Sequence, residues 1–391
     1  MPQAQVSQTG PMQSLDAFAA ATLASLEARH LKRTIETTHR LDGLWVERGG
    51  RRLLSFSCND YLSLSHHPAV KAAAKMAIDA YGAGAGASRL VTGDHPLIAR
   101  LEARLAALKG CEAACIFGSG YMTNAGVIPT FVEGGDIILV DALAHACIWA
   151  GAKLSGATVK TYAHNDLAHL AALLSEPREP NARVMVATEG VFSMDGDLAP
   201  LDEISALCQA HDAWLLNDDA HGLGVVGEGR GSVAAFADAD VPLQMGTLSK
   251  ALGSFGGYVC GSGLVIDLIK TRARTLVYAT GLPPASAGAA LAALDIIEAE
   301  PERVATPLAK ARLFARAANL PEPASAIVPV ILREAGPALA ASKALEAQGF
   351  LVTAIRPPTV PEGTARLRLA FTAGHPDAEV ERLARAVKAL A

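Results

Sequence analysis

This chain has few aromatic residues and no large excess of either charge. Phe, Trp and Tyr make up 5% of its 391 residues, and 34 basic residues stand against 39 acidic ones, which leaves a net charge of −5. We therefore expect no broad basic surface for nucleic acid or for a membrane. The composition is instead 51% hydrophobic, which is typical of a large globular protein with substantial cores.

Long apolar runs and regular cysteine spacings are missing as well. No stretch can span a membrane without a charge or a glycine, and the polar start at 1–10 lacks the apolar centre of a signal peptide. Without metal-ligand spacing the cysteines predict free thiols and no metal site; they are Cys58, Cys111, Cys115, Cys147, Cys208 and Cys260. Free thiols are typical of a reducing compartment, so we expect a cytoplasmic protein.

Apolar strand patterns alternate with helical patterns through most of the chain. Residues 1–12 are expected to form a loose tail, and a helix is predicted from about 14 to 31. Another helix is predicted to begin at His95-Pro96 and to end at Gly110. The remaining elements predicted before residue 300 are strands at 53–57, 114–117, 136–140, 182–188 and 213–216 and helices at 118–127 and 284–297. This alternation favours a mostly parallel sheet with helices on both faces.

The end of the chain has a different pattern. Strands are predicted at 327–332, 352–355 and 366–371, in an α+β arrangement separate from the preceding alternation. We therefore expect an α/β protein in three parts: an N-terminal segment at 1–55, a large domain at 56–290 and a small C-terminal α+β domain at 291–391.

The most informative stretch is Thr247-Leu248-Ser249-Lys250, which the glycine-rich residues 251–257 follow. A lysine in this setting is typical of the residue that binds pyridoxal 5'-phosphate (PLP) as a Schiff base. Asp218 follows an apolar run, which places it at the carboxyl end of a strand, where it can keep the pyridine nitrogen protonated. His221 is close enough to reach the phenolic oxygen of the cofactor. A solvated loop lysine and a turn-capping aspartate are the alternatives.

Further candidates follow the other predicted strands. Gly118-Ser119-Gly120-Tyr121 connects a strand to a helix, where exposed N–H groups can bind a phosphate. His145 can stack on the pyridine ring or lie in a surface loop, and Ser193 can bond the cofactor or cap a turn. A substrate carboxylate needs a bidentate guanidinium, which either Arg356 or Arg368 can supply.

Together these motifs resemble the α-oxoamine synthases, a family of fold-type-I PLP enzymes, from about Leu31 to the C-terminus. The most discriminating stretch is TAIRPPTVPEGTARLRL at 353–369. The other stretches that carry the resemblance are SCNDYL (57–62), LSHHP (64–68), GASRLVTGDH (86–95), HNDLAHL (164–170), TEGVFSMDGD (188–197) and DDAHGLGVVGEGRG (218–231). The resemblance implies a fold-type-I PLP-dependent transferase. Its large domain would hold a mostly parallel seven-stranded sheet covered by helices, beside a smaller α+β C-terminal domain.

The resemblance also implies a role for each matching residue. Lys250 would bind the cofactor and act as acid and base, and the catalytic residues would be Lys250, His145 and Asp218. The cofactor-binding positions would be Gly120, Tyr121, His145, Ser193, Asp218, His221, Thr247, Lys250 and Thr280, the last from the neighbouring subunit. The substrate-binding positions would be Arg33, His145, Thr359 and Arg368, with Arg368 for the amino-acid carboxylate. The chain departs from the usual residues at Ala144, Cys147 and Gly281.

Within the family, the chain is most similar to members that condense L-alanine with a pimeloyl thioester of coenzyme A or of a carrier protein, with loss of CO2. A sister enzyme that uses glycine or serine with another acyl-CoA is the main alternative. A PLP-fold transcription regulator would need a helix-turn-helix domain, which residues 1–55 do not indicate. A scaffold without activity would not need Lys250, Asp218 and His221 together. The family implies a homodimer, with neither nucleic acid nor membrane as a partner.

Overall fold

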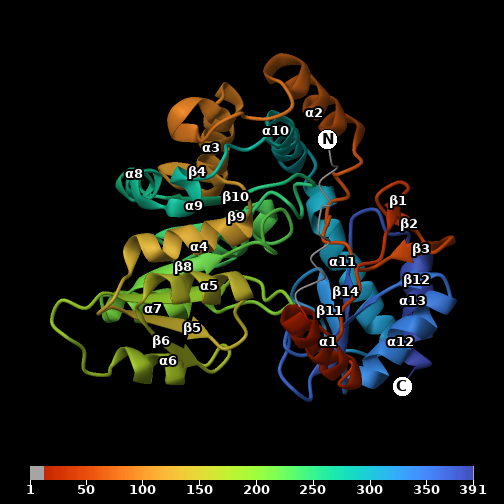
Figure 1. The fold of residues 1–391 in the computed structure, drawn as a ribbon. Helices are drawn as coiled ribbons and strands as arrows, with labels where there is room; N and C mark the ends of the chain where they lie inside the picture. The colour runs from red at the N-terminus through yellow and green to blue at the C-terminus, as the bar shows by residue number, and fades with distance from the viewer. Residues whose placement is uncertain (1–12, 391) are drawn as a thin grey trace, which may run out of the picture.

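The computed structural model describes residues 13–390, so the tail predicted at 1–12 lies outside the described residues. A seven-stranded sheet with the order β4-β10-β9-β8-β7-β5-β6 forms the centre of the larger part of the molecule (Figure 1). Its strands are β4 (Ala113–Phe117), β5 (Ile137–Asp141), β6 (Thr158–Tyr162), β7 (Val184–Glu189), β8 (Trp214–Asp218), β9 (Leu243–Thr247) and β10 (Gly257–Gly261). Within this sheet β10 runs in the opposite direction to the other six strands. The predicted mostly parallel seven-stranded sheet is confirmed.

Helices cover both faces of this sheet because its strands are apolar on both sides. Along β7, Met185 and Ala187 belong to one buried cluster and Val186 to another, as expected when side chains alternate between two covered faces. The first face is covered by α4 (Gly120–Phe131), α5 (Ala146–Ser155), α8 (Gly263–Arg272) and α9 (Arg274–Val277). The second is covered by α6 (Leu167–Leu174) and α7 (Leu201–Ala210).

Three more helices pack together beside β4 and β10. They are α2 (Pro68–Tyr81), α3 (Pro96–Lys109) and α10 (Pro284–Ala299), which meet in the largest buried cluster (Figure 1). Pro96 occupies the first turn of α3, and Gly110 ends the helix in a left-handed conformation with φ of 66°, which glycine adopts at little cost. Both predicted boundaries of this helix are confirmed. The short helical turns are η1 (Arg89–Gly93), η2 (Gly227–Gly229) and η3 (Ser232–Ala235).

The C-terminal part contains a three-stranded antiparallel sheet with the order β11-β14-β13. Its elements are β11 (Ile327–Arg333), β13 (Thr353–Ile355), β14 (Ala365–Ala370), α11 (Pro301–Ala318), α12 (Ala335–Ala347) and α13 (Asp377–Lys388). A second, four-stranded sheet joins β1 (His39–Arg40), β2 (Trp45–Arg48) and β3 (Arg51–Ser55) to β12 (Phe350–Leu351). The strand predicted at 352–355 is confirmed as β13, which pairs with β14. The short strand β12 before it was not predicted and pairs with β3.

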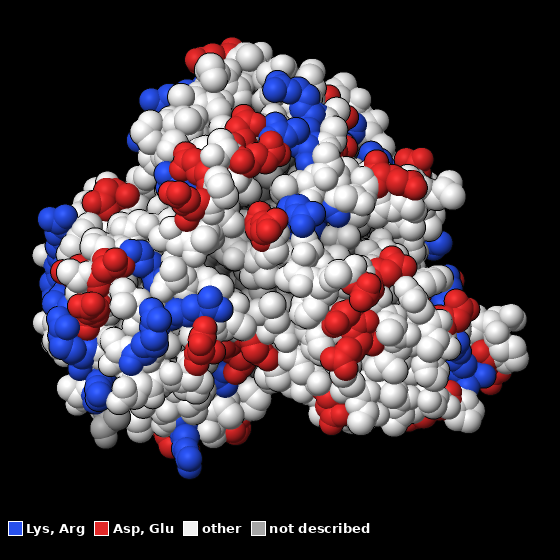
Figure 2. All heavy atoms as spheres, turned by 180° about the vertical axis from the view of Figure 1, so that it is seen from behind, with Lys and Arg blue, Asp and Glu red and all other residues white. Residues whose placement is uncertain are grey.

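The first helix, α1 (Gln13–Ala28), confirms the helix predicted near the N-terminus. None of its apolar side chains belongs to the buried clusters found among residues 13–390, and Phe18 is 70% exposed. Among residues 13–390, no helix has the length and apolar character that a membrane crossing requires. Acidic and basic side chains are interspersed over the face opposite to that of Figure 1 (Figure 2).

Candidate active site

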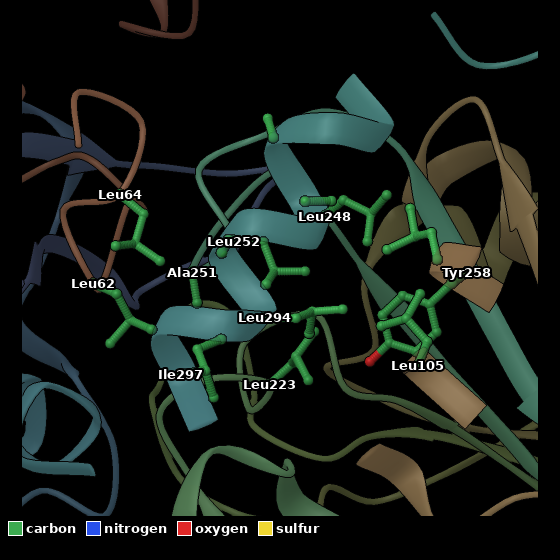
Figure 3. Packing of buried hydrophobic residues seen from close by; sticks show 14 of the residues in the cluster. Leu62, Leu64, Leu105, Leu223, Leu248, Ala251, Leu252, Tyr258, Leu294 and Ile297 are labelled. Atoms are coloured by element: carbon green, nitrogen blue, oxygen red, sulfur yellow. The ribbon is translucent and has the colours of Figure 1, made fainter. Parts of the chain in front are cut away.

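Lys250 lies in a turn after β9 whose backbone is held by buried neighbours. Leu248 and Leu252 are fully buried, in the same cluster as Leu294 and Ile297 of α10 (Figure 3). The backbone N–H of Gly253 also donates to the carbonyl of Lys250 at 2.8 Å. Since the turn is fixed on both sides, the Lys250 side chain is left to project into the adjoining cavity.

The amine of Lys250 is shifted toward its neutral form. Desolvation lowers the pKa of Lys250 to about 8, although Asp218 and Glu189 oppose the shift. Its Nζ lies 2.7 Å from Nε2 of His221. An amine with this pKa is partly unprotonated near neutral pH, as a nucleophile or a general base must be.

His221 connects Lys250 to the C-terminal part of the chain. Its Nδ1 lies 2.6 Å from the hydroxyl of Tyr61, and desolvation, with Lys250 and Arg368 adding to it, lowers the pKa of His221 well below its usual value. Arg368 donates to Oδ1 of Asn59 at 3.0 Å and to the Tyr61 hydroxyl at 3.4 Å. A chain of contacts therefore runs from Lys250 through a neutral histidine to a buried guanidinium.

Asp218 ends β8 beneath the cavity, as the sequence predicts. Its Oδ2 accepts from the side-chain amide of Asn124 at 2.7 Å, and its Oδ1 accepts from the backbone N–H of Ala220 at 3.0 Å. The thiol of Cys147 lies 3.7 Å from Oδ2 and 2.9 Å from Nδ1 of His145. Cys147, one of the departures from the family pattern, therefore lies between these two predicted catalytic residues.

The neighbouring Asp219 has a different environment. It is fully buried, pairs with Nζ of Lys109 at 2.8 Å and accepts from the backbone N–H of Ser232 at 3.0 Å. Asp219 is therefore a structural residue, and Asp218 is the carboxylate that faces the site.

Five predicted residues from distant parts of the chain line one cavity of about 260 Å³. They are His145, Ser193, His221, Lys250 and Arg368. The lining also includes residues to which the sequence pattern assigned no role, namely Ser57, Asn59, Met194, Thr353 and Ile355. The cavity therefore lies where β14 and β13 of the C-terminal part approach the seven-stranded sheet.

The start of α4 has the features of a phosphate site. Ser119 caps the helix by accepting from the N–H of Met122 at 3.2 Å, and the first turn of a helix leaves other N–H groups, here those of Gly120 and Tyr121, without intrahelical partners. An added Cβ on Gly120 would lie 3.5 Å from Oγ1 of Thr247. The free N–H groups of this first turn therefore lie beside Thr247, which fits the phosphate of PLP, while Lys250 and Asp218 fit its ring.

Several predicted residues lie away from this cavity, among them Arg356, which donates to the carbonyl of His30. Arg33 donates to the hydroxyl of Thr359 at 2.7 Å, so these two predicted substrate residues do contact each other. Thr280 is exposed and lines a separate cavity with Arg89. Next to it, an added Cβ on Gly281 would lie 2.4 Å from the carbonyl of Gly93, so close approach of the backbone accounts for that departure from the family pattern.

Several residues of the site were missed in the sequence. Tyr61 and Asn124 contact predicted site residues, and Glu189 is buried directly before the predicted loop of Ser193. Glu189 could have been predicted from the sequence, because a glutamate that follows the mostly apolar run at 184–188 is expected at the carboxyl end of a strand. Tyr61 and Asn124 have no such signal, because their contacts depend on the tertiary fold.

The sheet, its helical layers and the lysine after β9 define the fold-type-I class of PLP-dependent enzymes. The family model "Aminotransferase class I and II" matches residues 51–387. The putative 8-amino-7-oxononanoate synthase of Caulobacter vibrioides is 66% identical over 379 residues, 97% of this chain and 99% of that protein. The chain thus belongs to the aminotransferase class I and II family and, within it, to the 8-amino-7-oxononanoate synthases.

Two further similarities support this assignment. The 8-amino-7-oxononanoate synthase of Beijerinckia indica is 61% identical over 380 residues, 97% of this chain and 98% of that protein. A lysine-to-alanine variant of serine palmitoyltransferase from S. paucimobilis, solved with bound PLP–myriocin, has a TM-score of 0.90 and 26% identity over 97% of this chain and 98% of that chain. The resemblance to the α-oxoamine synthases is confirmed.

Proposed function

We propose that this chain joins L-alanine to a pimeloyl thioester, in a PLP-dependent reaction that releases CO2 and the free thiol. The product is 8-amino-7-oxononanoate, an intermediate of biotin biosynthesis. The observation that carries this proposal is that Lys250 and Arg368 line the same cavity, with Asp218 close by at the end of β8. The similarity of the chain to the 8-amino-7-oxononanoate synthases supports it.

Bound PLP supplies an electron sink for the negative charge that develops at Cα of the amino acid. Lys250 holds the cofactor, and with a pKa of about 8 its amine can remove the Cα proton and later return one. Asp218 would hold the proton on the ring nitrogen of the cofactor. The first turn of α4 would bind the phosphate through the N–H groups of Gly120 and Tyr121, together with the hydroxyl of Thr247.

Arg368 is the best candidate for the carboxylate of alanine. It is 6% exposed, and its hydrogen-bond partners are neutral oxygens of Asn59, Tyr61 and Ser193. Its charge therefore remains available for a substrate carboxylate in the cavity, where a guanidinium can bind both carboxylate oxygens. His145, at the open side of the same cavity, would cover the cofactor ring.

A second positively charged region, formed by Arg33 and Arg356, is suited to bind the carboxylate at the far end of a pimeloyl chain. Arg33 donates to the hydroxyl of Thr359 at 2.7 Å, and Arg356 donates to the carbonyl of His30 at 2.5 Å. Both contacts join the segment at 30–33 to the segment at 356–359, so two guanidinium groups lie in one region. Desolvation, together with the charge of Arg33, lowers the pKa of Arg356. Two neighbouring cations with neutral partners favour a terminal carboxylate over an uncharged acyl chain.

A sister activity with serine or glycine is the second candidate, favoured by the fold shared with serine palmitoyltransferase. The identity to that protein is 26%, far below that to the 8-amino-7-oxononanoate synthases, so we rank it second. The decisive experiment measures thiol release by the PLP-loaded enzyme from pimeloyl-CoA and from pimeloyl-carrier protein. Release with L-alanine but not with glycine or L-serine would support the first candidate, and the opposite pattern would support the second.

The assembly and location of the enzyme are parts of the same proposal. We infer a homodimer in the cytoplasm, with Thr280 of each subunit reaching the phosphate bound by the other. Leu90, Val91 and Tyr278 support this inference, since all three are more than 60% exposed and flank the bridge between Ser88 and Thr280. Large exposed apolar side chains in one region are typical of a protein interface. We also retain the domain boundaries 1–55, 56–290 and 291–391 as a proposal.

A further inference from the structure

Two carboxyl groups lie side by side at the end of the seven-stranded sheet. Glu189 ends β7 and Asp218 ends β8, and the two are register partners in neighbouring parallel strands. Met185 and Ala187 of β7 share a buried cluster with Leu216 of β8 on the face covered by α4 and α5. Because side chains alternate along a strand, Glu189 and Asp218 point to that same face. Neighbouring strands are about 4.8 Å apart, so the carboxyl groups are close neighbours.

Both carboxyl groups are buried, with 2% of Glu189 and 3% of Asp218 exposed. Asp218 accepts a hydrogen bond at each oxygen, from the amide of Asn124 and from the N–H of Ala220. Glu189 accepts at Oε2 from the N–H of Ser193 at 3.1 Å, whereas its Oε1 is buried and has no partner among residues 13–390. All of these donors are neutral.

Two adjacent buried anions would repel each other strongly, since the protein interior screens charge far less than water does. Such a pair instead shares one proton. Asp218, with a donor on each oxygen, is the better anion, and the unpartnered Oε1 of Glu189 is the better place for the proton.

The other groups around Glu189 are consistent with this division of charge. The titratable groups that face it are Asp218 on β8, Lys250 after β9, Cys147 on α5 and Tyr61 before α2. Burial and Asp218 raise the pKa of Glu189 to about 8, although Lys250 opposes the shift. Burial also raises the pKa of Cys147 and that of Tyr61, so both remain neutral.

We propose that Glu189 is a positioning residue that holds a proton on Oε1 at neutral pH and leaves Asp218 as the only carboxylate anion beneath the cavity. A single anion there can hold the proton of the ring nitrogen without a competing charge. It also avoids a second anion that would favour the protonated, inactive form of Lys250. The protonation of Glu189 is independent of the reaction, whereas its effect on Lys250 rests on the proposed function.

Difference infrared spectroscopy tests the proton directly, on the PLP-loaded enzyme and on the apoprotein. The wild-type protein should show the C=O band of a protonated carboxyl group at neutral pH, and this band should disappear as the pH rises through about 8. Glu189→Gln should lack the band. Asp195→Asn is the matched control, because Asp195 lies in the same loop and is ion-paired with Arg366.

The absence of the band from the wild-type protein at neutral pH would overturn the proposal, as would its persistence in Glu189→Gln. The wild-type titration needs no variant, so it decides the question even if Glu189→Gln fails to fold. A pH profile tests the positioning role. In the wild-type enzyme kcat/KM should fall as Glu189 ionises near pH 8, and Glu189→Gln should lose this inflection; an unchanged profile would contradict that role.

The outcome also separates this proposal from the proposed function. A carboxyl band without alanine-dependent thiol release would leave Glu189 protonated and reject the synthase activity. Thiol release without the band would retain the synthase activity and reject the proton on Glu189.

Discussion

At the scale of single residues, the site depends on burial that changes the charge of its groups. Lys250 is shifted toward a neutral amine, and His221 beside it is held neutral. Lys250→Ala should reduce kcat by at least about 10²–10⁴-fold, because it removes both the attachment of the cofactor and the acid–base group. The measurements are thiol release and borohydride trapping of PLP on the protein.

The matched control for that variant is Lys153→Ala, since Lys153 is an exposed lysine on α5. It should retain both the activity and the trapped cofactor. Wild-type turnover by Lys250→Ala would contradict the assignment of Lys250.

The paired guanidinium groups give a second prediction at this scale. Arg356→Ala should raise KM for pimeloyl-CoA about tenfold, because a charge-assisted hydrogen bond to the terminal carboxylate is lost. KM for heptanoyl-CoA, which lacks that carboxylate, should change little. Arg29→Ala is the control, since Arg29 is an exposed arginine bonded to the carbonyl of Ser25. Equal effects of Arg356→Ala on both thioesters would reject recognition of the terminal carboxylate.

At the scale of elements, one histidine connects the end of β5 to the loop that follows β7. His164 lies 3.1 Å from Oδ1 of Asp141 and 2.8 Å from Oδ2 of Asp197, and its ring packs edge-on against Phe192. Burial opposes the charge, but these two carboxylates outweigh it and raise the pKa of His164 to about 10. The loop that contains Ser193 is therefore joined to the end of β5, four residues before His145, by a charged imidazole.

This link predicts a pH-dependent stability. The pKa of His164 is raised above the unfolded value of about 6.5, so its contribution is fully present below that pH and is lost as the pH rises through about 10. His164→Gln should lower the free energy of unfolding by up to about 3 kcal/mol at pH 6, and by less at pH 9.5. Urea unfolding of both proteins at the two pH values measures the difference. A gap that is equal at both would contradict a charged His164.

Sequence patterns predicted those site residues whose positions depend only on the residues next to them in the chain. Asp218 follows an apolar run, so its position at the end of β8 could be predicted, and Lys250 stands out by the glycines that follow it. The contact of Glu189 with Asp218 could not be predicted, because it requires β7 and β8 to be neighbours in the sheet. The pairing of β3 with β12 joins residues from opposite ends of the chain, and no local pattern indicates it.

At the scale of the whole molecule, the position of Thr280 requires a second subunit if this residue serves the site. Thr280 is exposed and lines a cavity separate from that of Lys250. In a twofold-symmetric dimer, however, the surface around Thr280 can contact the site of the partner. Each site would then combine Lys250 of one subunit with Thr280 of the other.

Subunit complementation tests this arrangement. Lys250→Ala and Thr280→Glu homodimers should both be nearly inactive, the latter because a carboxylate would repel the cofactor phosphate. After both are unfolded and refolded together, about half of the dimers should be mixed, and one site in each should carry neither change, so about a quarter of the wild-type activity should return. No recovery, despite mixed dimers detected through two different affinity tags, would place Thr280 and Lys250 in the same subunit's site or exclude Thr280 from the site.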